Sequence, residues 1–257
     1  MPPIYRVDGD TVVTGPDAAG PWDRRMQHGS APASLVTWAA ERIATSVPMN
    51  IARVTIDLMR PVPVAPLTIT TEVLREGRKI QLCGVELFAD GVKVVGATVL
   101  KIKAQAHALP DDVGELPVTL PPPEASLVED GHAATSPFAG MMSMRAARGR
   151  FGQAGAGAIW FRVDHPLIAG EAVSQAMRAV VAADFSNGTA STLDFRAWTF
   201  INADLTVNLA RPPVGEWILL DGESWIGPDG TGLAMSRLAD RQGYFGRAVQ
   251  SLVIEKR

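Results

Sequence analysis

The stretch QHGSAPAS, residues 27–34, combines residue types that can bind a developing negative charge. Gly29 and Ser30 stand at the start of an expected helix. There, backbone N–H groups without intrahelical partners and the positive end of the helix dipole attract an anion. His28 is a candidate hydrogen-bonding side chain beside them. The alternative interpretation is an ordinary capped loop, with Ser30 as the expected N-cap of the helix.

Other catalytic patterns are missing from the sequence. No G-x-S-x-G nucleophile elbow occurs, which argues against an α/β-hydrolase esterase. No paired Cys/His spacing indicates zinc, and the glycine-rich GQAGAGAIW matches neither a dinucleotide fingerprint nor a P-loop. Cys83 lies within the apolar alternation IQLCGVELF, so we expect a small buried side chain rather than a nucleophile. We therefore expect no cofactor and no metal.

The composition of the chain argues against several classes of binding partner. A formal net charge of −3 argues against a general nucleic-acid or membrane-surface binder. No apolar run reaches the roughly 18 residues of a membrane span, and the N-terminus MPPIYRVDGDTVV has no apolar signal core. A single cysteine excludes a disulfide framework and favours the cytoplasm.

An internal repeat organises the chain. VTIDLMRP, residues 54–61, and LTVNLARP, residues 205–212, share threonine, leucine, arginine and proline at matching places. Further on, FADGVKVVG and LADRQGYFG match on alanine, aspartate and glycine. The separation is 151 residues at Thr55/Thr206 and 150 at Gly96/Gly246. A separation this wide predicts duplication of a whole domain rather than a solenoid, whose period is roughly 20–50 residues.

Each copy is expected to hold one helix followed by a meander of antiparallel strands. Apolar spacing predicts helices at 30–46 and 170–188, both rich in alanine and apolar nearly all round, so each is expected to be wrapped by a sheet. Asp184, at the end of the second helix, is expected to be a capping or buried structural carboxylate rather than a catalyst. Period-two alternation predicts strands at 67–73, 80–88, 92–103, 158–163, 217–225, 233–239 and 247–256.

Five stretches together resemble the acyl-CoA thioesterase II superfamily, particularly its thioesterase-like members. They are GPWDRRMQHGSAPASLVTWAAERI, ARVTIDLMRPVPVAPL, REGRKIQLCGVELFADGVKV, ADLTVNLARPPVGEWILLDGESW and ADRQGYFGRAVQSLVIE. The resemblance covers nearly the whole chain. It implies an α+β double hotdog, in which two central helices are wrapped by antiparallel sheet after an internal duplication. The expected division is an N-terminal hotdog at 1–104, a linker at 105–140 and a C-terminal hotdog at 141–257.

The resemblance also implies hydrolysis of an acyl-CoA thioester without a covalent intermediate. In the family an aspartate, a threonine or serine, and a glutamine hold the attacking water. Carried over, the aspartate is Asp204, eight residues before the proline of the RP strand, and the glutamine is Gln250 of the VQ pair. Trp225 falls at the place of the hydroxyl residue and is expected to line the pocket. Ser224 is one residue away, but a one-residue shift reverses strand facing.

The resemblance places the oxyanion site in the first copy. It implies that Gly29 donates its amide to the thioester oxygen, with His28 and Ser30 in the pocket wall. A carboxylate can take a proton from water and a carboxamide can hold that water, so the proposed pair is chemically sensible. Arg53 and Leu100 stand at the equivalent places of the first copy, which indicates one working site per chain.

The expected function is therefore hydrolysis of a fatty or small acyl-CoA thioester by carboxylate-activated water. Two alternatives stay open: an acyl-thioester-binding protein without chemistry, favoured by the tryptophan at position 225, and a hotdog enoyl-CoA hydratase. Asp204 and Gln250 could also lie on a solvated strand face, which is the plainer interpretation. The expected partner is the acyl-CoA substrate, with no nucleic acid and no membrane, and a homodimer is left open.

Overall fold

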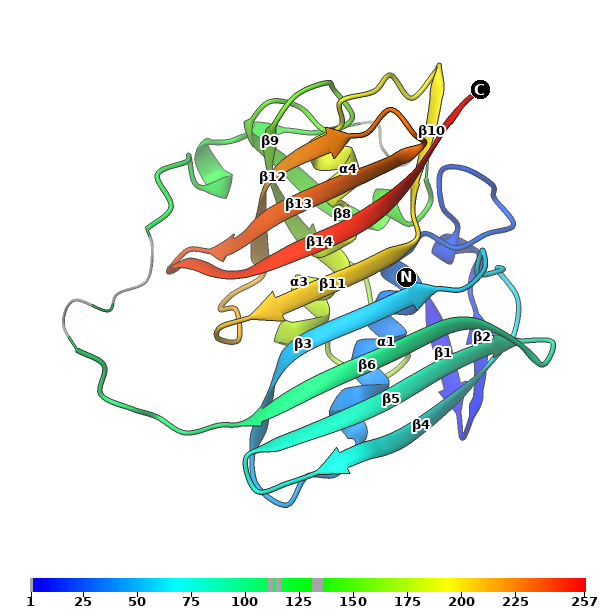
Figure 1. Ribbon diagram of the computed structural model, residues 1–257, viewed down its shortest axis with the longest axis vertical. Coiled ribbons are helices and arrows are strands. Elements are labelled where there is room, and N and C mark those ends of the chain that lie inside the picture. Colours follow the sequence, from blue (N-terminus) through cyan, green and yellow to red (C-terminus); the bar gives the residue numbers. More distant parts are fainter. Residues whose placement is uncertain (1, 111–112, 114–116, 131–135) are drawn as a thin grey trace.

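The computed structural model of the protein describes residues 2–110, 113, 117–130 and 136–257. Parts of the predicted linker, residues 111–112, 114–116 and 131–135, lie outside the described residues. The remaining chain forms one large antiparallel sheet with few helices, shown in Figure 1. This confirms the α+β class and the antiparallel strands expected from the sequence.

The sheet is 14-stranded, and its strands follow the order β1-β2-β4-β5-β6-β3-β11-β14-β13-β12-β9-β8-β7, with β10 paired to β14 beside this path. The strands of the first half are β1 (Tyr5–Asp8), β2 (Thr11–Thr14), β3 (Met49–Leu58), β4 (Leu67–Glu76), β5 (Ile80–Ala89) and β6 (Val92–Lys103). Those that follow are β7 (Leu127–Val128), β8 (Met142–Arg148), β9 (Gly157–Val163), β10 (Trp198–Asn202), β11 (Asp204–Leu209), β12 (Trp217–Ile226), β13 (Thr231–Asp240) and β14 (Gly243–Lys256).

The two copies of the repeated strand pair with each other in the middle of the sheet. β3 and β11 run antiparallel, and Thr55 lies directly opposite Thr206. Their hydroxyl oxygens are 3.4 Å apart. Because equivalent residues of the two copies face each other here, the seam has the register of a local two-fold axis. The sheet therefore continues from the first half of the chain into the second without an open edge at this point.

Helices cover the concave face of the sheet (Figure 1). α1 (Ser30–Arg42) packs against α3 (Gln175–Ala183), which is followed by the short α4 (Ser186–Thr189). Apolar side chains from both helices, such as Leu35, Val36, Val180 and Val181, belong to one hydrophobic core that spans both halves. Each fully buried side chain of this size contributes about 1.5–3 kcal/mol, so the contact between the helices holds the halves together.

Both helices are shorter than expected, and the predicted N-cap is wrong. α1 begins at Ser30 with Gly29 as its N-cap residue, because the Ser30 hydroxyl is used in a contact with the second half of the chain. α3 begins only at Gln175, where the Ser174 hydroxyl accepts from the backbone N–H of Met177. The predicted start at residue 170 did not account for this capping serine.

Several elements were not predicted. The N-terminal stretch forms the hairpin β1–β2, with a turn at Gly9, whose φ is 61°, and β2 extends the sheet along β4. The predicted extended linker includes a packed segment: Val118 and Leu120 contact a small apolar cluster on the second half. There the indole N–H of Trp160 donates to the carbonyl of Pro121 at 2.9 Å.

Cys83 is buried, as expected, and its thiol lies 3.2 Å from the Oε1 of Gln81. Burial raises the pKa of the Cys83 thiol, and the thiol therefore stays protonated at neutral pH. A protonated, enclosed thiol is a poor nucleophile, which supports the packing interpretation.

The ADRQG turn of the second copy is held by Asp240, which is fully buried. Arg211 forms two ion-pair contacts with its carboxylate, at 2.6 and 2.9 Å. The backbone N–H groups of Val214 and Gln242 donate to the same carboxylate. Burial raises the pKa of Asp240, but these hydrogen bonds outweigh burial and the pKa lies below its ordinary value.

We expect Asp240→Asn to lower the free energy of unfolding by about 1–3 kcal/mol, because the donors lose a charged acceptor. Since the folded-state pKa is depressed, the stabilisation is present above the unfolded-state pKa of Asp240 and is lost as pH falls through the folded-state pKa. Urea unfolding at pH 7 and at acid pH measures this: the difference between parent and variant should shrink on acidification. Asp90→Asn, at the exposed equivalent position, is the control and should change stability by less than about 0.5 kcal/mol. A variant as stable as the parent at pH 7 would contradict this role.

Candidate active site

A cavity of ≈ 850 Å³ lies where the start of α1 meets the end of α3. Its wall draws on both halves of the chain: the loop before α1 and the end of β3 from the first half, and α4, β10 and the end of α3 from the second. The polar residues of its wall include His28, Gly29, Asp184, Asn187 and Asn202. The site therefore exists only when the two halves are packed together.

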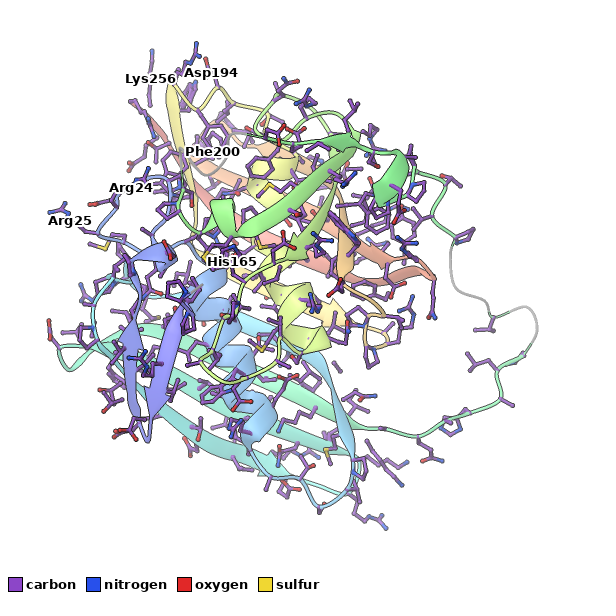
Figure 2. All side chains as sticks on the ribbon, turned by 180° about the vertical axis from the view of Figure 1, so that it is seen from behind. Arg24, Arg25, His165, Asp194, Phe200 and Lys256 are labelled. Carbon is purple, nitrogen blue, oxygen red and sulfur yellow. The ribbon has the colours of Figure 1, made fainter. Side chains whose placement is uncertain are left out.

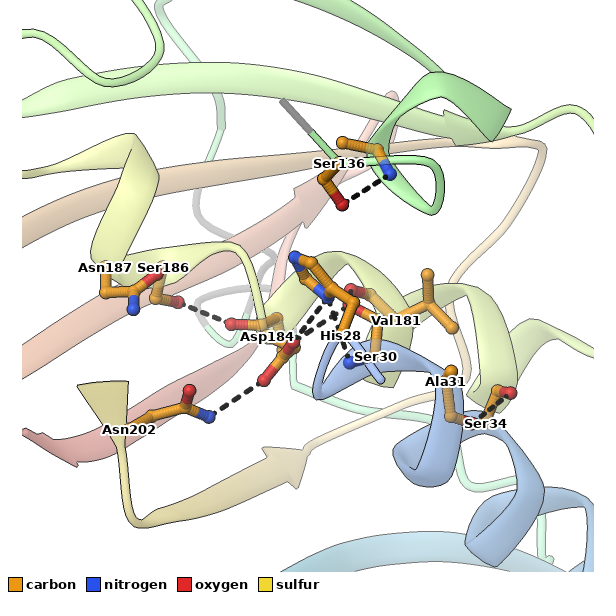
Figure 3. Close-up of polar contacts among 12 residues, drawn as sticks. His28, Ser30, Ala31, Ser34, Ser136, Val181, Asp184, Ser186, Asn187 and Asn202 are labelled. Carbon is orange, nitrogen blue, oxygen red and sulfur yellow. Dashed lines mark hydrogen bonds and ion pairs between the residues drawn. The ribbon is translucent and has the colours of Figure 1, made fainter. Parts of the chain in front are cut away.

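Asp184 is the buried carboxylate of this cavity. It follows the last residue of α3, and its side chain is 3% exposed. Figure 3 shows it between His28 and Ser30 on one side and Asn202 on the other. A buried carboxylate without hydrogen-bond donors would be strongly disfavoured as an anion. Its neighbours are therefore what allows it to lie here.

Donors from the first half meet one oxygen of this carboxylate. The Ser30 hydroxyl lies 3.0 Å from Asp184 Oδ2 and 3.0 Å from the carbonyl of Val181. His28 Nδ1 lies 3.0 Å from the same Oδ2, and the backbone N–H of Ser30 also points at Nδ1, at 3.2 Å. Because Nδ1 either carries a proton or accepts one, only one of these two contacts of His28 is a hydrogen bond at a time.

Donors from the second half meet the other oxygen. The Asn202 amide donates to Asp184 Oδ1 at 2.9 Å. Gln250, which is fully buried, has its Nε2 3.1 Å from the carbonyl of Asp184 and 3.3 Å from Oδ1. Its Oε1 accepts from the backbone N–H of Asn187 at 3.2 Å. Gln250 thus fixes the end of α3 and the start of α4 in one position.

Gly29 allows α1 to come close to this carboxylate. A Cβ at this position would lie 2.6 Å from Asp184 Oδ1 and 2.8 Å from Oδ2, both too short for any side chain. Glycine is therefore required by close approach, since its φ of −56° is accessible to all residues. The start of α1, with its outward backbone N–H groups, is next to the buried carboxylate.

An aromatic layer encloses the imidazole of His28. Its ring centroid is 4.5 Å from that of Phe185 and 5.2 Å from that of Phe138, the latter stacked. Both phenylalanines are almost fully buried. This packing restricts ring rotation and keeps His28 directed at Asp184.

Four of the residues predicted from the sequence, His28, Gly29, Ser30 and Gln250, meet in this site, and Asp204 does not join them. Its Oδ1 accepts from the backbone N–H of Ser251 at 2.5 Å, and it is not part of the cavity wall. β10 ends at Asn202 and β11 begins at Asp204, so the strand is interrupted between them. The contacts of Asp204 are therefore with the neighbouring strand, whereas Asn202 reaches the carboxylate.

The expectation that Trp225 lines the pocket is corrected by its position. Trp225 lies on β12 with 61% of its surface exposed, and it is not part of the cavity wall. The position of a residue along a strand does not by itself show which face of the sheet is buried. The argument for a non-catalytic protein that depended on this tryptophan loses its basis.

Asp184 is a buried carboxylate at the end of α3, as expected from the sequence. Its place in the cavity wall and the contact with Asn202 are not predicted. One signal was available: Asp184 is the only acidic residue between Glu171 and Asp194, and it ends an almost entirely apolar helix. A carboxylate retained in such surroundings is a candidate functional group. Nothing in the local pattern of residues 198–204 distinguishes Asn202 from Asp204.

Two further observations concern the described part of the chain only. It contains no group of three or more His, Cys, Asp or Glu side chains placed to hold a metal ion. Among its helices, none has the length and apolar character needed to cross a membrane.

Comparison with known proteins gives matches for both halves and for the whole fold. The family model of the acyl-CoA thioesterase N-terminal domain matches residues 18–102, and that of the C-terminal domain matches residues 110–254. A search of curated proteins gives no significant match.

Solved structures share the fold over nearly the whole chain. A hot dog fold protein of unknown function from Alicyclobacillus acidocaldarius superposes with a TM-score of 0.76 at 14% identity, covering 98% of this chain and 95% of that one. The tesB protein of Mycobacterium avium subs paratuberculosis gives 0.71 at 17% identity, covering 97% and 95%. The acyl-CoA thioesterase II TesB2 of Mycobacterium marinum gives 0.69 at 14% identity, covering 98% and 95%. With the C-terminal model alone matching more than half of the sequence, the resemblance is confirmed: the chain belongs to the acyl-CoA thioesterase family and is a thioester hydrolase.

Proposed function

We propose that the protein hydrolyses fatty or small acyl-CoA thioesters with a water molecule activated by Asp184. One observation carries this proposal: the carboxylate of Asp184 is buried in the cavity wall, beside the start of α1, with hydrogen-bond donors from both halves around it. A carboxylate held in this way is preorganised to orient a water and to take its proton.

The reaction follows from the arrangement. Water attacks the thioester carbonyl carbon, its proton passes to Asp184, and the carbonyl oxygen becomes an oxyanion. The backbone N–H of Gly29, at the positive end of the α1 dipole, is our candidate oxyanion donor. Collapse of the tetrahedral intermediate breaks the carbon–sulfur bond and releases CoA as its thiolate, while the acyl group leaves as a carboxylic acid. The proton on Asp184 returns to solvent or to the thiolate.

The other polar residues of the site act by positioning. Gln250 and Asn202 hold Asp184 from the second half, and Ser30 and His28 hold it from the first. Four neighbours around one carboxylate leave it little freedom to rotate. We propose that this fixed orientation keeps one lone pair directed at the water.

Asp204 stays the competing hypothesis for the base, with Gln250 as its partner. The geometry favours Asp184, because Asp204 accepts a backbone hydrogen bond from Ser251 outside the cavity wall. Substitution of each aspartate separates the two hypotheses.

We also propose that the chain is a double hotdog that arose by internal duplication, with hotdogs at 1–104 and 141–257 and a linker at 105–140. Two observations support this. Separate family models match the two parts, and the repeated threonines Thr55 and Thr206 face each other at the seam of the sheet. Each chain then has one site, because the carboxylate of Asp184 comes from the second hotdog and the start of α1 comes from the first.

We expect Asp184→Asn to lower kcat for the best acyl-CoA substrate by about 10²–10⁴, because the amide keeps the shape but cannot take the proton. Affinity for a non-hydrolysable acyl-CoA analogue should change by less than about tenfold. An assay of CoA thiol release measures kcat, and calorimetry measures the affinity for the analogue.

Asp204→Asn is the matched control and should retain activity within a few-fold of the parent. The reverse result, with Asp204→Asn inactive and Asp184→Asn active, would establish Asp204 as the base. A parent that binds acyl-CoA analogues but releases no thiol would support a binding protein, and hydration of enoyl-CoA would support a hydratase.

Gly29→Ala tests the close approach of α1 to the carboxylate. Because the new Cβ would overlap Asp184, the carboxylate must move, and we expect kcat to fall by about 10². The matched control is Gly96→Ala on β6, where a Cβ has nothing within 4 Å. Thiol release and thermal unfolding should be measured for both variants. Full activity in a folded Gly29→Ala protein would show that the geometry at Gly29 is not needed.

A further inference from the structure

A second group of residues at the same cavity is aromatic, and two of its members, Trp22 and Phe195, are part of the wall. Trp22 lies in the pre-helix loop, defined here as residues 20–29, and its indole stacks on the ring of Phe195 with centroids 5.6 Å apart. Its edge meets Phe200, at 5.8 Å, and Phe195 and Phe200 lie 4.4 Å from each other. Since the phenylalanines come from the second half of the chain, the aromatic group bridges the two halves across the cavity wall.

The position of the indole is fixed from a further side. The guanidinium of Arg257 lies over the Trp22 ring, 5.0 Å from its centroid. Arg257 is itself held by the second half: its backbone N–H donates to the carbonyl of Ala197, and its Nε donates to the hydroxyl of Thr199. Trp22 is therefore a clamped side chain rather than a free one, although it is only partly buried.

The surroundings of Trp22 on the cavity wall are mostly apolar. Met26 from the pre-helix loop and Phe195, Ile201 and Val253 from the second half share the wall with it. Charged residues of the wall near Trp22 include Asp23 and Arg257. Asp23 pairs with Arg25, whose exposed side chain points away from the protein in Figure 2, and Arg257 lies over the Trp22 ring. An apolar wall of this kind fits a hydrocarbon chain better than the phosphates of CoA.

We propose that Trp22 is the residue that sets the size of the acyl group accepted by this cavity. The inference rests on the proposed function and adds the determinant of its specificity. The clamped indole occupies volume next to the apolar wall, and an acyl chain extends only as far as the indole allows. Removing the ring opens that volume to further methylene groups of the substrate.

The test is a series of saturated acyl-CoAs of increasing even length, hydrolysed by the parent, Trp22→Phe and Trp22→Ala. We expect the length with the highest kcat/KM to move to longer chains in Trp22→Ala, with Trp22→Phe between it and the parent. For each newly accommodated methylene, KM should fall by about fourfold, as expected for apolar burial, while kcat on short chains should stay within a few-fold.

Trp38→Phe is the matched control for Trp22→Phe. Trp38 lies on α1 in the same half, also carries an arginine over its ring, with Arg42 at 5.0 Å, and is not part of the cavity wall. Its length profile should equal that of the parent. Thermal unfolding of all variants shows whether they are folded, and Trp22→Phe preserves most of the stacking if Trp22→Ala unfolds.

Two results with the Trp22 variants would overturn the proposal. One is an unchanged length profile in folded Trp22 variants. The other is a KM change by the same factor at every length, together with weaker inhibition by free CoA, which would place Trp22 against the CoA moiety. Binding of non-hydrolysable thioether analogues of the same lengths provides the second readout. The parent could bind these analogues with a length preference, and Trp22→Ala could shift that preference, while the parent hydrolyses none of the thioesters. This result would contradict the proposed hydrolysis but support the role of Trp22. A parent without length preference in either assay overturns the role of Trp22.

Discussion

A buried carboxylate between two helices is the constraint on which the architecture of this protein depends. Asp184 lies at the end of one helix, against the start of another, with its side chain only 3% exposed. An anion in such a place requires donors, and they come from four directions: Ser30 and His28 from one half, Asn202 and Gln250 from the other. The close approach of α1 in turn requires glycine at position 29. Removal of the first half would take away the contacts of Ser30 and His28 with this carboxylate.

The sheet and helices supply what this contact needs. The seam between β3 and β11 joins the halves into one sheet and fixes how they are oriented. The packing of α1 on α3 then brings the N-terminal end of the first helix to the C-terminal end of the second. Hydrogen-bond donors at the start of a helix and a carboxylate meet in one cavity as a result. The candidate site therefore lies at the interface between the halves, and its wall draws on both.

Much of the fold could be predicted from the sequence, because alternation and repetition are local signals. The strands of both meanders, the two principal helices, the repeat that relates Thr55 to Thr206, and the family were accessible in this way. The pairing of these two threonines was not predicted. The hairpin β1–β2 and the packed linker were missed, since short segments with weak patterns are stabilised by tertiary contacts. The second helix begins later than expected because Ser174 is its N-cap.

The site was harder to predict, because it depends on which residues face each other across the interface. Gln250, Gly29, Ser30 and His28 are predicted from their types and from resemblance, and the structure brings them together around Asp184. Asp204 is predicted by counting along the strand, whereas an interruption between β10 and β11 changes what each residue contacts. Trp225 was misplaced for a similar reason: the exposed face of a strand cannot be told from counting alone.

The most direct test of the central claim is a crystal structure with a ketone analogue of acyl-CoA, in which a methylene replaces the thioester sulfur. The account predicts the ketone oxygen about 3 Å from the backbone nitrogen of Gly29. It also predicts an ordered water within about 3 Å of Asp184 and facing the ketone carbon. A ketone bound beyond the reach of Asp184, or one whose nearest water is held by Asp204, would contradict it.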